Sequence, residues 1–197
     1  MRRPEEYTST KKKIIEAALN IISNEGLCNV TIRKLASLAG VNVAAINYHF
    51  GSKEQLINQA LLSITEQLEN SFEVLKNEDL LPEERLKYFL DGYTNTMLTY
   101  PVIIKNFIMQ SITEYQISGE YEAFIKEQGY DLIKNTLKQI RPEDSETIVE
   151  MRIMQLFGGL AFPVLVANRT IALKDFDYSH EDVRSQYIDI MMKYICR

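Results

Sequence analysis

Apolar residues recur every three or four positions along most of the chain, the spacing typical of amphipathic α-helices. Only eight Gly and five Pro occur among the 197 residues, which also favours helices over a sheet. The chain is therefore predicted to be all-α. The expected helices cover approximately residues 10–24, 31–40, 42–51, 53–76, 82–100, 104–117, 120–140, 143–168 and 180–196.

The stretch TIRKLASLAGVNVAAINYHFGSK, residues 31–53, has the pattern of two short helices joined by a tight turn. Gly40 lies where the first helix must stop and the chain must turn, which Gly does without steric cost. The outer face of the second helix is short and nearly uncharged, and this suits base edges in a DNA major groove. The stretch predicts a helix-turn-helix. That outer face consists of Val43, Ala44, Asn47 and Tyr48.

The ends of the predicted helix-turn-helix carry groups that suit phosphate contacts. Thr31 is placed to cap the first helix, and Arg33 follows in its first turn. Ser52 to Gln55 has the pattern of a capping box that opens the next helix, with Lys53 beside it. The alternative is that any helical hairpin of an α-protein would show such a pattern.

The sequence resembles the TetR (tetracycline-repressor-like) family of bacterial transcription regulators. The resemblance lies in T-I-R-K-L-A-x-x-A-G-V at 31–41 and Y-H-F-G-S-K-E-x-L at 48–56, preceded by an Ile-Ile-x-Ala-Ala pattern at 14–18 and by Gly26. It covers roughly the first 60 residues, and beyond them only the helical layout matches. The family commonly has Tyr where this chain has Asn47, so whether Asn47 or Tyr48 takes the main base-reading role stays open.

The resemblance and the helical geometry together assign roles in binding double-stranded operator DNA. His49 is assigned either a phosphate contact or a structural role. Base-edge contacts are expected from Arg33, Val43, Ala44, Ala45 and Asn47, and backbone-phosphate contacts from Thr31, Tyr48, His49 and Lys53.

The distribution of charge agrees with a nucleic-acid partner at one end of the chain. The whole chain has a net charge of −5, which alone argues against DNA binding. Residues 1–55, however, hold eight Lys or Arg against five Asp or Glu, and residues 56–197 hold fourteen against twenty-two. A basic head on an acidic body is expected where only the head meets phosphates. We therefore predict a DNA-binding domain over 1–55 and a ligand-binding and dimerisation domain over 56–197. The long predicted helix over 53–76 joins the two domains.

The body has apolar stripes with a few polar groups beside them, as small-molecule sites have. Core packing is the alternative explanation for most of these residues. The resemblance implies an effector pocket between the middle helices, and no ligand class follows from the sequence. The candidate lining residues are Phe89, Tyr93, Met97, Phe107, Glu114, Tyr115, Arg152 and Phe157.

The last two predicted helices are expected to form a two-fold homodimer. The segment 153–167 is apolar around nearly its whole circumference, more than its own chain should cover. The alternative is that this surface is simply monomer core. The interface core is expected to include Leu156, Leu160, Val164, Tyr187, Ile188 and Met191.

Several classes of protein find no support in the sequence. No apolar run approaches the roughly 18 residues of a membrane span, and the N-terminus lacks the apolar region of a secretion signal. Cys28 and Cys196 lack ligand spacing, as expected of free thiols in the cytoplasm. Neither a G-x-S-x-G nor an H-E-x-x-H motif occurs, so no enzyme, metal or cofactor is predicted.

The function expected from these observations is transcriptional regulation. The predicted protein is a homodimeric repressor that a small-molecule effector releases from a palindromic operator. The alternative is a helical binding or scaffold protein of the same fold without a transcriptional role.

Overall fold

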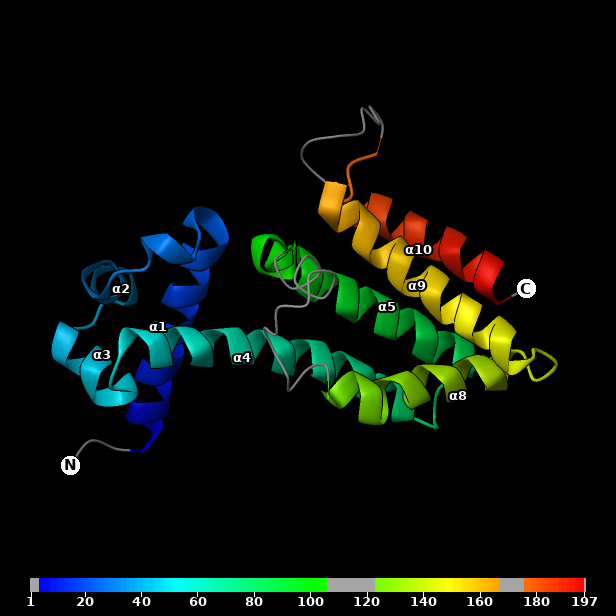
Figure 1. Cartoon of the computed structure of the whole chain (residues 1–197), viewed down its shortest axis with the longest axis horizontal. Coiled ribbons are helices and arrows are strands. Elements are labelled where there is room, and N and C mark those ends of the chain that lie inside the picture. The colour runs from blue at the N-terminus through cyan, green and yellow to red at the C-terminus, as the bar shows by residue number, and fades with distance from the viewer. Residues whose placement is uncertain (1–3, 106–122, 167–175, 197) are drawn as a thin grey trace. The chain divides into compact units, whose positions relative to one another are not determined.

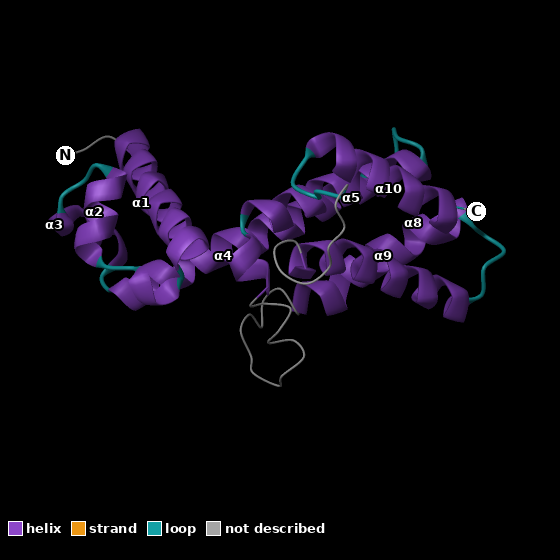
Figure 2. Cartoon of the chain, turned by 90° about the horizontal axis from the view of Figure 1, so that it is seen from above, coloured by secondary structure: helices purple, strands orange, loops and turns teal. Residues whose placement is uncertain are grey.

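A computed structural model describes residues 4–105, 123–166 and 176–196. These residues form helices and connecting loops, with no strand among them (Figures 1 and 2). The chain divides into two compact units, Met1–Glu66 and Gln67–Arg197. The helical prediction is confirmed for the described residues.

The first unit is built on α1 (Pro4–Glu25), which is followed by the short 3₁₀ turn Leu27–Asn29 and by α2 and α3. α1 begins earlier than the expected residue 10, since Pro4 fits the first turn of a helix. α2 (Ile32–Ala39) packs on both α1 and α3 (Val43–Phe50). The shared core buries Ile14, Ala17, Ala18, Leu19, Ile21, Ile22, Val30, Leu35, Ala36, Ile46 and Phe50.

α4 (Lys53–Ser71) corresponds to the first part of the predicted long helix. The remaining predicted turns are not α-helical, because Phe72–Lys76 forms a 3₁₀ helix, η2. The buried stripe of α4 contains Ala60, Ile64 and Leu68.

In the second unit, α5 (Pro82–Thr99) packs against η2, α8, α9 and α10. A π-helical turn, Ile125–Gly129, leads into α8 (Tyr130–Ile140). The two final helices are α9 (Glu146–Val166) and α10 (Glu181–Ile195), as Figure 1 shows. The predicted helix over 104–117 lies mostly outside the described residues, although 101–105 are helical.

Aromatic rings join η2, α5 and the start of the π-helical turn. The Phe72 ring is fully buried, with its centroid 4.6 Å from that of Phe89, 5.9 Å from that of Tyr93 and 5.2 Å from that of Phe124. The Tyr93 ring lies edge-on to that of Phe157 of α9 at 5.9 Å. This aromatic cluster occupies the middle of the body.

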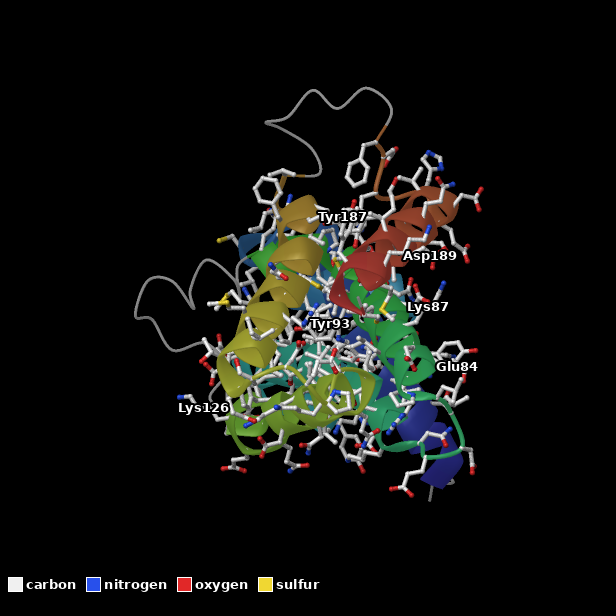
Figure 3. All side chains as sticks on the ribbon, turned by 90° about the vertical axis from the view of Figure 1, so that its right-hand side faces the viewer. Glu84, Lys87, Tyr93, Lys126, Tyr187 and Asp189 are labelled. Carbon is white, nitrogen blue, oxygen red and sulfur yellow. The ribbon has the colours of Figure 1, made fainter. Side chains whose placement is uncertain are left out.

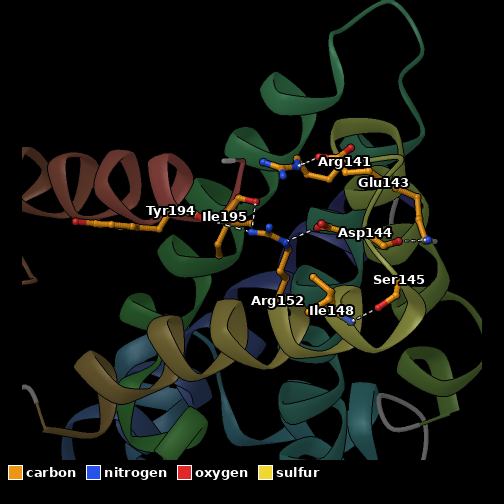
Figure 4. A network of polar contacts seen from close by, with 9 residues as sticks. Arg141, Glu143, Asp144, Ser145, Ile148, Arg152, Tyr194 and Ile195 are labelled. Atoms are coloured by element: carbon orange, nitrogen blue, oxygen red, sulfur yellow. Dashed lines mark hydrogen bonds and ion pairs between the residues drawn. The ribbon is translucent and has the colours of Figure 1, made fainter.

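A polar network fixes α9 against the end of α10 (Figure 4). The Nε of Arg152 on α9 lies 2.6 Å from Oδ2 of Asp144, and both side chains are mostly buried. The Nη1 of Arg152 donates hydrogen bonds to the carbonyl oxygens of Tyr194 at 3.2 Å and Ile195 at 2.7 Å. Because carbonyls at a helix C-terminus carry partial negative charge, the guanidinium satisfies one carboxylate and one helix end together.

α9 has a length and composition that a membrane-spanning helix would also have, with a mean hydropathy of 1.4, but only 33% of its apolar window is buried. This corrects the expectation that no segment of the chain is long and apolar enough to span a membrane. A helix that packs inside a protein passes the same test, and α9 packs on α5, α8 and α10. Its burial is one-sided, so the opposite side carries uncovered apolar side chains.

We expect Phe72→Ala to lower the free energy of unfolding by about 3–5 kcal/mol, because it empties the centre of the aromatic cluster. Tyr88→Ala, on the exposed side of α5, is the matched control and should change it by less than about 0.5 kcal/mol. Urea unfolding, monitored by circular dichroism, measures the free energy of unfolding of both variants. Equal effects of the two substitutions would contradict the central place of Phe72.

Candidate nucleic-acid interface

The start of α2 is capped as the sequence predicts. Thr31 is extended, and its Oγ1 accepts a hydrogen bond from the Lys34 N–H at 3.3 Å. At the other end Gly40 has φ +65°, a left-handed conformation that favours Gly, and the chain turns there into α3. The expected roles of Thr31 and Gly40 in forming the turn are confirmed.

α3 starts with a cap that the sequence reasoning missed. The side-chain oxygen of Asn42 accepts a hydrogen bond from the Ala45 N–H at 2.7 Å. The signal was present, because Asn is among the residues preferred immediately before a first helical turn. Asn42 therefore belongs to the framework of the turn, whereas Asn47 presents its amide to solvent.

The remaining side chains of α3 divide between core and surface. Ile46 and Phe50 are buried, and Ala45 is half-buried. The surface side carries Val43, 41% exposed, and Tyr48, 76% exposed, together with the exposed Ala44 and Asn47.

His49 is only 9% exposed and its ring lies 5.4 Å from that of Tyr48 and 6.2 Å from that of Phe50, measured between centroids. This burial favours the structural role over the phosphate contact, the two alternatives left open by the sequence.

The loop into α4 forms the other edge of the candidate interface. Gly51 has φ +73°, and Ser52 Oγ accepts a hydrogen bond from the Gln55 N–H at 3.1 Å, which confirms the predicted cap. Hydrogen bonds from its own backbone N–H and from Ser52 lower the pKa of Glu54. Lys53 is half-buried at this helix start.

Some of the cations in the head already contact other side chains of the first unit. Lys34 is bound to Glu25 of α1, an ion pair that the sequence did not reveal. The Lys11 ammonium lies 5.9 Å from the centre of the Phe50 ring, within cation–π range. Arg33 is exposed in the first turn of α2. Arg33 and Lys53 thus lie in the first turns of α2 and α4, the helices on either side of α3 in the sequence.

The candidate effector residues of the body are brought together only in part. Phe89, Tyr93 and Met97 are buried along α5, and Phe157 contacts Tyr93 from α9. Arg152 is not with them, because Asp144 and the end of α10 hold its guanidinium. The predicted Phe107, Glu114 and Tyr115 lie outside the described residues.

Polar groups between α5 and α10 were not foreseen. The hydroxyls of Thr94 and Tyr178 are buried side by side without a hydrogen bond of good geometry, and burial raises the pKa of Tyr178 to about 12. Burial also raises the pKa of Asp91, which faces Lys87, Asp189 and Arg184. Lys87 of α5 pairs with Asp189 of α10 (Figure 3). Because these groups are far apart in sequence, only the fold reveals that they meet.

A family described as bacterial regulatory proteins, tetR family, matches residues 14–60, which include all of α2 and α3. This segment matches the TetR family. The chain is 33% identical over 76 residues to the HTH-type transcriptional regulator BetI of Rhizobium meliloti, covering 39% of this chain and 37% of that protein. The chain is 35% identical over 78 residues to the HTH-type transcriptional regulator TtgR of Pseudomonas putida, covering 40% of this chain and 37% of that protein. The chain thus spans under two fifths of the length of these curated relatives.

Solved structures extend the similarity in fold over nearly the whole chain. A TetR family transcription regulator from Marinobacter aquaeolei has a TM-score of 0.66 at 14% identity, covering 97% of both chains. The ketosteroid transcriptional regulator KstR2 of Mycobacterium tuberculosis has a TM-score of 0.63 at 18% identity, covering 93% of both. At these identities the similarity shows the fold of the body and not its ligand.

The two Asn residues at α3 should respond differently to substitution. Asn42→Ala should destabilise the head by about 1 kcal/mol, because the first turn of α3 loses its cap. Hydrogen exchange of the amides of residues 43–50 should become faster. Asn47→Ala should change the free energy of unfolding by less than about 0.5 kcal/mol. Asn42→Ser, which keeps an acceptor oxygen, is the control, and slower exchange in Asn42→Ala would contradict the assignment.

Proposed function

We propose that this chain is a DNA-binding transcriptional regulator that acts as a homodimer and responds to a small molecule held in its body. The observation that carries the proposal is the exposed, uncharged face of α3, flanked by the capped starts of α2 and α4. Side chains on such a face reach base edges, while free N–H groups and cations at the flanking helix starts suit phosphates. A cytoplasmic location follows, because that is where bacterial DNA lies.

Apolar side chains left uncovered on α9 and α10 support the homodimer. Met154 and Tyr194 are each 74% exposed, and further exposed residues share their helices. Large exposed apolar patches mark interaction sites, and two copies of such a helix pair make a four-helix bundle. The exposed set comprises Ile148, Met151, Met154, Phe162, Ile190 and Tyr194.

The interface core expected from sequence is wrong for most of its members. Leu156, Leu160 and Val164 face the inside of their own chain, as does Ile188. Tyr187 is half-buried and donates its hydroxyl to the Gly159 carbonyl at 2.9 Å, and Met191 packs beside it. These residues join α9 to α10 within one chain, so a partner copy would meet the opposite side of α9.

The aromatic cluster supports a small-molecule site. Phe89, Tyr93 and Phe157 place rings from α5 and α9 together, with Met97 one turn further on. An effector shifts DNA affinity only by its preference for one of two states, and moving a 1:99 equilibrium to 99:1 takes about 5.5 kcal/mol. A ligand that combines apolar area with a hydrogen-bonding group is best suited to supply that preference. Repression relieved by such a ligand is the form of regulation that we propose.

We expect Lys53→Ala to weaken binding to all DNA sequences alike. Removing one phosphate contact should flatten the slope of log affinity against log salt by about one unit. Fluorescence anisotropy with an operator selected from random DNA by the unaltered protein measures this slope. The control is Lys126→Ala, an exposed cation of the body, which should leave the slope unchanged (Figure 3). Absence of salt-dependent binding by the unaltered protein would favour the alternative of a helical scaffold protein.

We expect Met154→Glu and Ile190→Glu to convert a dimer into a monomer of 22.8 kDa. A buried, unpaired carboxylate costs several kcal/mol at an interface, whereas it costs little at an exposed site. Sedimentation equilibrium at micromolar concentration measures the mass. Tyr88→Glu on α5 is the control and should stay dimeric. A monomeric unaltered protein would refute the dimer.

A further inference from the structure

The surface side of α3 has an unusual chemical composition for a helix that reads DNA. The whole helix, VAAINYHF, contains no Lys, Arg, Asp or Glu. Val43, Ala44, Asn47 and Tyr48 follow the spacing of a single helix face, and all four are exposed. That face offers methyl groups, one amide and one phenol.

Such a face lacks the groups that usually recognise G·C pairs. Guanine presents two acceptors, O6 and N7, in the major groove, and Arg or Lys most often reads them. The cytosine N4 amino group is read by Glu or Asp. α3 carries none of these side chains, so a G·C pair opposite it would find no charged partner.

The same face has the groups that suit A·T pairs. The Asn47 side chain is an amide, which can accept from adenine N6 and donate to N7 at once. The methyl groups of Val43 and Ala44 can contact the C5-methyl of thymine, which no other base in DNA presents. Asn42, which could otherwise compete for a base, is engaged in the cap of α3.

The cations of the head lie outside this face. Arg33 belongs to α2 and Lys53 to α4, while Lys34 is bound to Glu25. A cation can therefore reach a guanine only from outside α3, at a position of the half-site other than those opposite this face.

We propose that α3 reads a core of A·T pairs in each half-site, with an adenine bound by Asn47 and a thymine methyl packed against Val43 or Ala44. This inference rests on the proposed DNA-binding function and specifies the base chemistry of the same interface. Guanine, where the half-site contains it, lies beside the core and is read by a cation outside α3, such as Arg33.

The test begins with an operator selected from random duplex DNA by the full-length protein. Each thymine of one half-site is then replaced in turn by deoxyuridine, which lacks only the C5-methyl group. Each adenine is replaced by 7-deazaadenine, which lacks only the N7 acceptor. Fluorescence anisotropy at fixed salt measures each dissociation constant, and thymines outside the half-site serve as the control.

We expect deoxyuridine to weaken binding about threefold to fivefold at one or two core positions, because each replacement removes one buried methyl group. We expect 7-deazaadenine to weaken it at least about fivefold at one core position, the loss of half of a bidentate contact.

Variants assign these losses to side chains. In Asn47→Ala the 7-deazaadenine penalty should disappear, and in either Val43→Ser or Ala44→Ser the deoxyuridine penalty should fall below about twofold. Tyr88→Ala in the body should leave both penalties intact.

Three results would overturn the inference while leaving DNA binding established. The first is a selected core of G·C pairs opposite α3. The second is the absence of any deoxyuridine or 7-deazaadenine penalty in the half-site. The third is a set of penalties that persists unchanged in all three α3 variants. Failure to select any operator would instead refute the proposed function itself.

Discussion

A helix of eight residues cannot sustain itself in water, and the candidate interface depends on that constraint. Isolated helices shorter than about 12–15 residues are marginal even when their residues favour helix formation. α3 is held by burial of Ile46 and Phe50 and by the Asn42 cap. Since one side of such a short helix must be spent on packing, only four side chains remain for a partner. The chemistry of those four therefore decides what the protein recognises.

The head could be predicted closely from sequence because its determinants are local. Thr31, Gly40 and Ser52 act on backbone groups within three or four residues, and such short-range chemistry is visible in the order of residues. The outer face of α3 follows from helical spacing alone. The Lys34–Glu25 pair could not be foreseen, because it joins two helices whose relative placement is a property of the fold.

The body was harder to predict for a definable physical reason. α9 is apolar around most of its circumference, so spacing does not tell which side turns inward. Leu156 and Leu160 were therefore assigned to a partner although they pack inside their own chain. Arg152 also lies away from the aromatic cluster. Its guanidinium binds the Asp144 carboxylate and the backbone carbonyls that end α10, and the latter contact joins residues more than forty positions apart and shows no side-chain signal in the sequence.

The change of helix type at Phe72 makes the length of this segment adjustable. A 3₁₀ helix rises about 2.0 Å per residue and an α-helix about 1.5 Å, so rewinding the five residues Phe72–Lys76 would shorten the segment by about 2.5 Å. In the 3₁₀ form, the first residue of the segment, Phe72, packs against the rings of Phe89 and Phe124. A molecule that rearranged those rings would thus act on the pitch of the chain as well as on its packing.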